Sequence, residues 1–226
     1  MHDAKLVWAT PEADEILAYI ARVSNPQGQQ AQTPESVSNL LAYMEKEGHV
    51  SPFTMANLCV EVNTTRAIGR QIIRHWTIFC QEFSQRYADA NLLGEFVYSE
   101  CRMQDTKNRQ NSKENASEED KQFWLEAQQE VAEVVARRYK QALERKIAKE
   151  VCRNLLPEGM TASRIYLNST LRTWIFYLRS RLHPSTQKEH RLIALDLARI
   201  FQEQAPVTFN AFFADLDWEG AKVNGS

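Results

Sequence analysis

Apolar side chains recur every three or four residues through most of the chain, which predicts a protein built mainly from helices. The sequence marks the N-termini of two of these helices. Thr33 is a cap residue followed by proline, and Ser117 begins an acidic sequence that resembles a capping box. The expected helices span residues 11–23, 33–48, 65–76, 117–146, 148–155, 171–181 and 186–204.

Three short runs rich in β-branched and aromatic residues predict strands at residues 58–62, 96–98 and 165–167. The polar stretch 105–119 is rich in Asn, Gln and Lys, and it predicts an exposed loop. The length suits one sizeable domain. We therefore expect a single domain over residues 1–226, with residues 105–119 as an insertion within it.

Composition and charge exclude several classes of protein. The formal net charge of −2 argues against a general binder of duplex DNA or of membrane surfaces. No apolar run approaches the roughly 20 residues of a membrane span, and the first residues do not open a signal peptide. The four cysteines form no C-x-x-C pair and the five histidines show no metal-binding spacing. We expect a cytoplasmic chain, or one in the host cytoplasm if a virus encodes it, with reduced thiols and no metal.

Glycine is scarce, with 7 residues in 226, and no two lie close enough to form G-x-G-x-x-G or a P-loop. Two common ways of holding a phosphate are thereby excluded. A nucleotide bound by this chain must be held by other groups.

Arginine offers such groups on the helix expected at 65–76. Arg66, Arg70 and Arg74 are spaced by four and form one stripe, whereas Ile68 and Ile72 are expected to face the core. No acidic residue lies on this helix to balance the stripe. A solvated basic face is one interpretation. A pocket for phosphate or a carbonyl-rich heterocycle is the other, because the planar guanidinium suits both.

A second concentration of arginine follows at residues 153–181. Arg172 and Arg179 are seven apart and share a helix face, whereas Arg181 points to another side. We expect Arg179 to carry ordinary surface charge.

Four ordered segments resemble the flavin-dependent thymidylate synthases. Arg74-His75-Trp76, seven residues and then Ser84-Gln85-Arg86-Tyr87 is similar to the family's RHR-x7-S signature. His49-x-Ser51-Pro52-Phe53 is similar to its H-x-[ST]-P-F segment, and residues 148–157 to its E-x-A-R-x-x-L-P segment. Arg172, Arg181 and then Gln187-x-Glu189 match its R-x8-R…Q-x-E ending. The resemblance spans roughly residues 15–210.

The resemblance implies an α+β fold, in which a small twisted, mostly antiparallel sheet packs with several long helices. It implies the reductive methylation of dUMP to dTMP, with methylenetetrahydrofolate as carbon donor, FAD as cofactor and NADPH as reductant. It also implies a homotetramer with shared active sites, whose partners are a nucleotide, a folate and its own copies, without nucleic acid or membrane.

The resemblance also implies the site residues by position. The expected catalytic residues are Arg181, whose cation would favour loss of the uracil N3 proton, and Ser84. The residues expected around dUMP are Gln71, Arg74, Glu82, Phe83, Ser84, Gln85, Arg86, Arg153 and Arg181. The residues expected around FAD are Ser51, Arg74, His75, Trp76, Glu82, Thr170, Arg172 and Phe176.

Two positions depart from the family pattern. Trp76 stands where the signature has its second arginine, and Phe176 stands where Asn or His is usual. Trp76 would stack on a flavin or folate ring, or fill volume.

Two alternatives stay open. One is the same architecture acting on another pyrimidine nucleotide or transferring hydroxymethyl. The other is a non-catalytic nucleotide- or RNA-binding protein that uses the arginines of residues 66–86.

Overall fold

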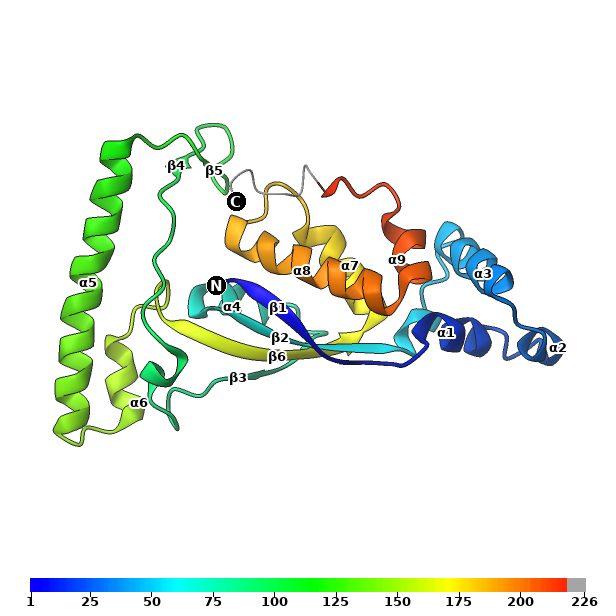
Figure 1. Cartoon of the computed structure of the whole chain (residues 1–226), viewed down its shortest axis with the longest axis horizontal. Coiled ribbons are helices and arrows are strands. Elements are labelled where there is room, and N and C mark those ends of the chain that lie inside the picture. The colour runs from blue at the N-terminus through cyan, green and yellow to red at the C-terminus, as the bar shows by residue number, and fades with distance from the viewer. Residues whose placement is uncertain (219–226) are drawn as a thin grey trace. The chain divides into compact units, whose positions relative to one another are not determined.

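Helices and short strands are mixed along the chain in the computed structural model, which describes residues 1–218 (Figure 1). The strands are β1 Asp3–Ala9, β2 Asn57–Thr65, β3 Phe79–Glu82, β4 Met103–Gln104, β5 Ser112–Lys113 and β6 Ala162–Thr170. The α-helices are α1 Ala13–Ala21, α2 Pro26–Gln30, α3 Pro34–Lys46, α4 Arg66–Ile72, α5 Glu118–Glu144, α6 Lys149–Cys152, α7 Leu171–Arg181, α8 Lys188–Gln204 and α9 Pro206–Phe213. The 3-10 helices are η1 Pro52–Thr54, η2 Ala90–Leu93 and η3 Arg153–Leu155.

One four-stranded sheet has the order β1-β2-β6-β3, and β4 pairs antiparallel with β5 so that Met103 faces Lys113. The expected α+β class with a small, mostly antiparallel sheet is confirmed. The described residues form two compact units: unit 1 holds residues 1–2, 63–74 and 81–165, and unit 2 holds residues 3–62, 75–80 and 166–218. Strands β2, β3 and β6 each contribute residues to both units.

The core of unit 2 lies where α7 and α8 run side by side and α8 packs on β1 (Figure 1). Large aromatic side chains fill it, among them Trp174, Tyr177 and Phe201, all fully buried. The indole of Trp174 donates to the carbonyl oxygen of Leu58 at 3.0 Å, so its one polar atom is satisfied. This packing fixes α7, which carries three of the expected site residues.

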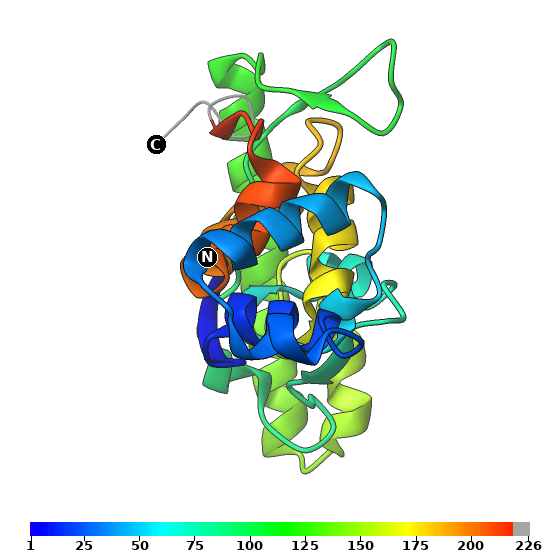
Figure 2. The same ribbon diagram turned by 90° about the vertical axis from the view of Figure 1, so that its right-hand side faces the viewer.

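Helices α1, α3 and α9 lie together at another part of unit 2 (Figure 2). Asp14 of α1 is buried, and its carboxylate accepts hydrogen bonds from the main-chain N–H groups of Val207 and Thr208 and from the Thr208 hydroxyl. These N–H groups belong to the first turn of α9, where helix donors lack partners within the helix. Asp14 thus caps α9 from a distant part of the sequence.

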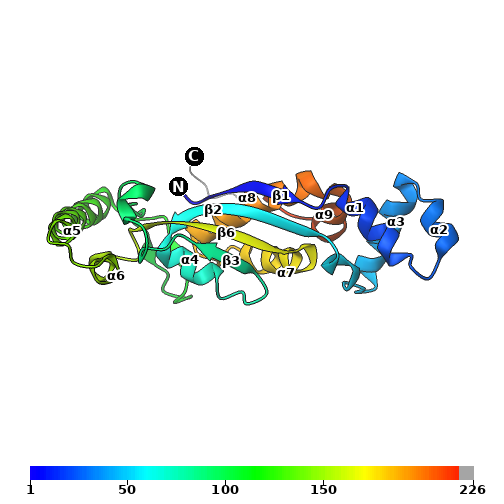
Figure 3. The ribbon, with the colours of Figure 1, turned by 90° about the horizontal axis from the view of Figure 1, so that it is seen from below.

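The long helix α5 dominates unit 1, and Figure 3 looks along it with α6 at its side. Only Gln128, Ala132 and Tyr139 of α5 are buried. Tyr139 packs in a small cluster with Ala90 and Cys152. Most of the α5 surface is therefore solvent-exposed in the described chain.

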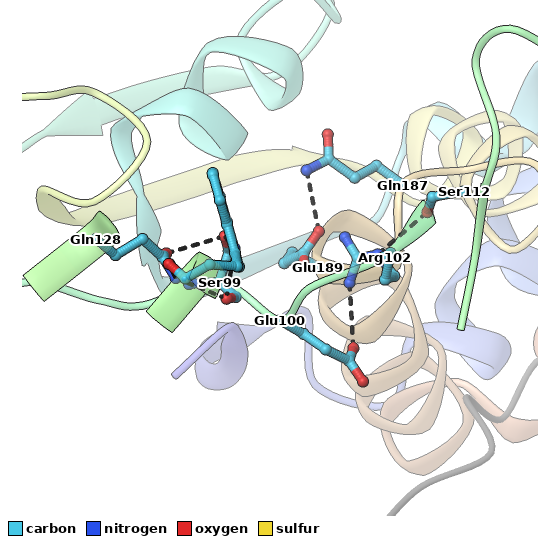
Figure 4. A network of polar contacts seen from close by, with 8 residues as sticks. Ser99, Glu100, Arg102, Ser112, Gln128, Gln187 and Glu189 are labelled. Carbon is cyan, nitrogen blue, oxygen red and sulfur yellow. Dashed lines mark hydrogen bonds and ion pairs between the residues drawn. The ribbon is translucent and has the colours of Figure 1, made fainter. Parts of the chain in front are cut away.

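Gln128 fastens the segment that precedes β4 to α5 (Figure 4). Its Oε1 accepts from the N–H of Ser99 at 2.7 Å and from the Ser99 hydroxyl at 3.1 Å, and its Nε2 donates to the Ser99 carbonyl at 3.1 Å. A buried amide that uses both of its ends in this way holds one defined rotamer.

Most expected helices are confirmed within a few residues, but the helix expected at 65–76 ends at Ile72. Ile68 and Ile72 are buried, as expected. Arg74 lies beyond the helix end, so only Arg66 and Arg70 share its stripe. The imidazole of His75 binds Arg181 of α7, and such tertiary contacts override a local helical pattern.

The strand expected at 96–98 is wrong. Val97 makes one main-chain bond, from its N–H to the carbonyl of Met160 at 2.8 Å, and no ladder follows. Phe96 and Tyr98 instead line a cavity of about 450 Å³ in unit 1. Within the polar stretch 105–119, residues 112–113 form β5. The pattern also missed β1, β3, α2 and α9, since β1 and β3 are largely exposed and α2 and α9 are short.

Candidate functional site

A cavity of about 290 Å³ in unit 1 is rich in arginine. We call it the arginine cavity, and its lining residues are Arg66, Arg70, Gln85, Arg153, Asn154, Leu156 and Glu158. Helix α4 supplies the first two, the turn after β3 supplies Gln85, and η3 with the following loop supplies the rest. Gln85 and Arg153 belong to the expected dUMP set, and the structure places them in one cavity.

Gln85 is buried to 5% exposure, yet its Nε2 has no hydrogen-bond partner within residues 1–218. A buried amide donor without a partner is costly, and most such groups in proteins are satisfied. Nε2 needs an acceptor, and a phosphate or carbonyl oxygen in the cavity would be one. Its orphaned state is the clearest sign of a ligand in unit 1.

The three arginines of the cavity differ in their partners. Arg66 pairs with Glu82 at 3.2 Å, and Arg70 pairs with Glu158 at 3.1 Å on a more exposed surface. Arg153 is half-buried and has no carboxylate partner in the described part of the chain. Its unbalanced positive charge gives the cavity a preference for anions.

The turn that carries the SQR sequence is open to solvent apart from Gln85. Ser84 accepts at its carbonyl oxygen from the N–H groups of Tyr87 and Ala88, at 3.1 and 2.9 Å. Arg86 makes an exposed ion pair with Glu150 at 3.4 Å. Ser84 and Arg86 are therefore exposed on the surface of unit 1. Phe83 follows β3, and its N–H donates to the carbonyl of Arg164 at 2.9 Å.

Two other members of the dUMP set adjoin the end of α4. Gln71 is half-buried on the helix, and Arg74 is exposed just beyond it. Neither lines the arginine cavity.

In unit 2, Arg181 at the end of α7 binds His75. The Arg181 Nε donates a hydrogen bond to Nε2 of His75 at 2.9 Å, and the Arg181 Nη2 lies 2.8 Å from the same atom. Burial and, second, the Arg181 guanidinium lower the pKa of His75 below its ordinary value. His75 is thus a neutral acceptor, and Arg181 has no carboxylate partner among the described residues. The Arg181 cation is oriented but not neutralised.

Tyr177 supports His75 from the interior of unit 2. Their rings meet edge to face with centroids 4.9 Å apart, and the Tyr177 hydroxyl lies 2.8 Å from the Nε2 of His190. Burial raises the pKa of Tyr177, while burial and the nearby Arg181 and His75 lower the pKa of His190 to about 3. Both groups are neutral near pH 7, so the support adds no charge.

The expected FAD residues of unit 2 form an exposed aromatic and cationic set. Trp76 is 89% exposed and Phe176 is 50% exposed, and the guanidinium of Arg172 lies 5.9 Å from the Phe176 ring centre. Trp76 therefore fills no core volume in the described chain, which leaves stacking as its expected role. The Phe176 ring beside Arg172 suits an aromatic ligand that carries phosphates.

The remaining expected residues have structural contacts of their own. Thr170 caps α7, where its hydroxyl accepts from the N–H of Thr173 at 3.3 Å. Ser51 is exposed before η1. In the Q-x-E segment, Gln187 donates through Nε2 to Glu189 at 3.0 Å (Figure 4).

Comparison with known proteins settles the family. The sequence model described as "Thymidylate synthase complementing protein" matches residues 5–207. A flavin-dependent thymidylate synthase of Synechocystis sp. is 41% identical over 203 residues, covering 90% of this chain and 89% of that protein. The chain belongs to this family. A probable flavin-dependent thymidylate synthase of Paramecium bursaria Chlorella virus 1 is 38% identical and covers 91% of each chain.

Solved structures share the fold of this family member. A UMP/dUMP methylase, PolB from Streptomyces cacaoi, bound with 5-Br dUMP, matches with a TM-score of 0.82 and 24% identity over 93% of this chain and 94% of that one. The same protein bound with 5-Br UMP matches with a TM-score of 0.78 over 93% of each chain.

The thymidylate synthase motifs thus fall in both units of the chain. All dUMP-set residues but Arg181 lie in unit 1, and all FAD-set residues but Arg74 and Glu82 lie in unit 2. Sequence reasoning did not include Asn154 and Glu158 in the site, and no pattern marks them. The stripe of Arg66 and Arg70 had a phosphate or heterocycle pocket as one of its two interpretations, but neither residue was in the expected dUMP or FAD set, and both line the arginine cavity. No sequence signal joins Tyr177 to His190.

Within residues 1–218, no group of three or more His, Cys, Asp or Glu side chains is placed to hold a metal ion. No helix in that range is long and apolar enough to cross a membrane.

Proposed function

We propose that this chain is an enzyme that methylates dUMP to dTMP with a flavin cofactor. The observation that carries the proposal is the arginine cavity with its orphaned Gln85 amide. A nucleotide phosphate would give Nε2 its acceptor and would balance the charge of Arg153. The SQR turn and Arg153 would hold the phosphate end of dUMP, with Ser84, Gln85 and Arg86 as its ligands.

In this proposal Arg181 acts on the uracil ring, where it stabilises the anion left by loss of the N3 proton. Methylation at C5 needs an electron-rich ring, and loss of the N3 proton supplies one. A fixed cation beside N3 stabilises the resulting anion, and a cation paired with a carboxylate would do so less well. Arg181 meets this requirement because its partner, His75, is neutral.

The chemistry of unit 2 fits a flavin. Trp76 and Phe176 offer exposed rings for stacking, while Arg172 and Ser51 offer donors to a cofactor phosphate. When bound, a flavin supplies redox chemistry that no side chain can perform. The protein's part is to bind the flavin and the nucleotide, and the proposal assigns Arg153 to the nucleotide phosphate and Arg181 to the uracil ring.

The finer features belong to the same proposal. FAD is the flavin, NADPH the reductant and methylenetetrahydrofolate the carbon donor. The chain acts in the cytoplasm as a homotetramer with shared active sites. Exposed apolar residues of α5 support self-association, since a solvated 27-residue helix rarely shows so many: Phe123, Trp124, Leu125, Val131 and Val134.

The test is a reconstituted assay with FAD, NADPH and methylenetetrahydrofolate, in which mass spectrometry identifies the product from dUMP, UMP and deoxyuridine. We expect a gain of one methyl group on dUMP and little turnover of deoxyuridine, which lacks the phosphate. Arg153→Gln should raise the KM for dUMP by about ten- to a hundredfold, because it removes a charge-assisted contact.

Arg179→Gln is the matched control. Arg179 is also an arginine of the chain's second cluster, but it pairs with Glu45 on the surface at 3.1 Å. Its substitution should leave the KM for dUMP unchanged. Protein that cannot be reconstituted with a flavin, or that methylates none of the three substrates, would overturn the proposal. Preference for UMP over dUMP, or a hydroxymethyl product, would revise the substrate or the group transferred. Tight salt-sensitive binding of polynucleotide without turnover would favour the non-catalytic alternative.

A further inference from the structure

One carboxylate oxygen in unit 1 gathers donors from two neighbouring elements. Glu82 ends β3, and its Oε1 accepts from Arg66 Nη1 at 3.2 Å and from Ser163 Oγ at 2.7 Å. Its Oε2 has no hydrogen bond to any described residue. The carboxylate is therefore anchored by one oxygen and open at the other.

The first donor, Arg66, is itself held firmly. It is the first residue of α4, and its own N–H donates to the carbonyl of Thr161 at 3.0 Å. The next N–H, of Ala67, donates to the carbonyl of Glu158 at 3.0 Å. The segment before β6 thus satisfies two of the N-terminal N–H donors that lack partners within α4. These bonds fix the position of Arg66 at the start of the helix.

Close packing of α4 on β6 adds to this. A Cβ atom at Gly69 would lie 2.8 Å from Cδ1 of Ile165, closer than real Cβ contacts, so any larger residue would require the Ile165 side chain to move. The same Cβ would lie 3.6 Å from Glu82 Oε1. The anchored oxygen of Glu82 therefore lies close to the backbone of α4 at Gly69.

The second donor, Ser163, is a buried residue of β6, and it lines neither the 450 Å³ cavity nor the arginine cavity. Its hydroxyl has a single described bond, to Glu82. The one bond that its hydroxyl makes to a described residue therefore fastens Glu82, at the end of β3, to β6.

We infer that Ser163, together with Arg66, is a positioning residue: it holds Glu82 by Oε1 so that Oε2 is presented to the bound nucleotide and flavin. The inference rests on the proposed function for the identity of those ligands. Ser163 does not touch ligand, and it acts through Glu82 alone. Arg66 lines the arginine cavity as well, so Ser163 is the cleaner residue to test.

The experiment compares Ser163→Ala with Thr161→Val. Thr161 is a buried residue two positions away, and its hydroxyl also donates one bond of 2.7 Å, but to the carbonyl of Pro157. Both variants lose one buried hydroxyl, so both should lower Tm by similar amounts. Only Ser163→Ala should raise the KM for dUMP or the Kd for FAD, by about tenfold, because a misplaced site group weakens binding.

A double-mutant cycle with Glu82→Ala, which removes the acceptor of the Ser163 hydroxyl, separates positioning from a general structural effect. In that background Ser163→Ala should cause no further change in KM or Kd. Equal effects of Ser163→Ala and Thr161→Val on ligand binding, or a full effect of Ser163→Ala in the Glu82→Ala background, would overturn the inference. If Ser163→Ala does not fold, Ser163→Cys offers a slightly larger side chain with a weaker donor and is judged by the same two criteria.

Crystal structures of the variants keep this inference distinct from the proposed function. If the wild-type enzyme turns over no dUMP, the proposed function fails, and the position of the Glu82 carboxylate then decides. A carboxylate that turns in Ser163→Ala and stays in Thr161→Val supports the positioning role. An unmoved carboxylate in both contradicts it.

Discussion

Two arginines of this chain are fixed in opposite ways. Arg66 is buried in unit 1 and gives its guanidinium to the carboxylate of Glu82. Arg181 of unit 2 gives its guanidinium to the neutral imidazole of His75. In both cases the side chain is held in place. Only the second arrangement leaves the positive charge unbalanced within residues 1–218.

The difference separates fixing a structure from stabilising an anion. A guanidinium bound to a carboxylate has little charge left to offer, whereas one bound to an imidazole keeps its full charge with a defined direction. We therefore expect loss of Arg66 to affect mainly stability and the placement of Glu82, and loss of Arg181 to affect mainly the rate of reaction.

The largest expected effect is on catalysis. Arg181→Met should lower kcat with dUMP by about a hundred- to a thousandfold, the range for removing one group that stabilises a developing anion. Arg181→Lys should recover part of the rate, since it keeps the charge but not the planar fork. Steady-state kinetics with each variant measure this.

A rise in pH provides the check on Arg181. More alkaline solution removes the uracil N3 proton without help, so the deficit of Arg181→Met should shrink as pH rises. Arg179→Met, on the same helix but paired with Glu45, should keep the wild-type rate. A deficit that is independent of pH would show that Arg181 has a different task.

The next effect is on stability. Arg66→Met leaves the largely buried Glu82 carboxylate without its cation, and we expect a loss of about 2 to 3 kcal/mol in the free energy of unfolding. Chemical denaturation measures this loss. The double variant Arg66→Met with Glu82→Gln should regain much of it, because no unpaired charge remains. A double variant as unstable as Arg66→Met would mean that Arg66 acts through packing.

The sequence indicated these two arginines unequally. Spacing by four placed Arg66 on a helical stripe, and position within a family motif marked Arg181. Neither signal names a partner. Glu82 lies 16 residues from Arg66 and His75 lies 106 from Arg181. Whether a given arginine is balanced or free depends on such long-range pairings, which local patterns do not contain.

The fold shows the same limit. Amphipathic periodicity predicted α7 and α8 well, because each buries one face against its own unit. The largely exposed α5 was marked instead by the capping sequence that begins at Ser117. Periodicity predicted too long a helix at 65–76, because contacts such as that between His75 and Arg181 hold the segment from Arg74 onward outside the helix. It missed β1 and β3 because their exposed side chains leave no alternating pattern.

The lowered pKa values of the two histidines near Arg181, His190 and His75, predict how the free energy of unfolding depends on pH. Since the pKa of His190 in the folded chain is about 3 and the unfolded value is about 6.5, the unfolded chain binds more protons between these values. Stability is therefore greatest above pH 6.5 and falls on acidification, by about 2 kcal/mol from pH 7 to pH 5. His75, whose pKa is also lowered, adds a drop of the same sign.

His190→Gln tests this dependence because it keeps a polar side chain and removes the titration. Thermal unfolding between pH 7 and pH 5 should show a shallower decline than in the wild type. His183→Gln, which changes an exposed histidine, should retain the wild-type slope. Equal slopes in all three proteins would place the acid sensitivity elsewhere.

The smallest expected effect concerns Arg70. It pairs with a carboxylate, as Arg66 does, but both side chains of the Arg70–Glu158 pair are exposed to solvent. Exposed ion pairs contribute about 0 to 1 kcal/mol, so Glu158→Gln should hardly change Tm. Glu158 also lines the arginine cavity, and its loss makes the cavity more positive. The KM for dUMP should therefore fall by about two- to threefold at low salt and return to the wild-type value at high salt, where exposed charges are screened. An unchanged KM at low salt would mean that Arg70 and Glu158 stand outside the field felt by the phosphate, and that Arg153 alone sets the preference of the cavity for anions.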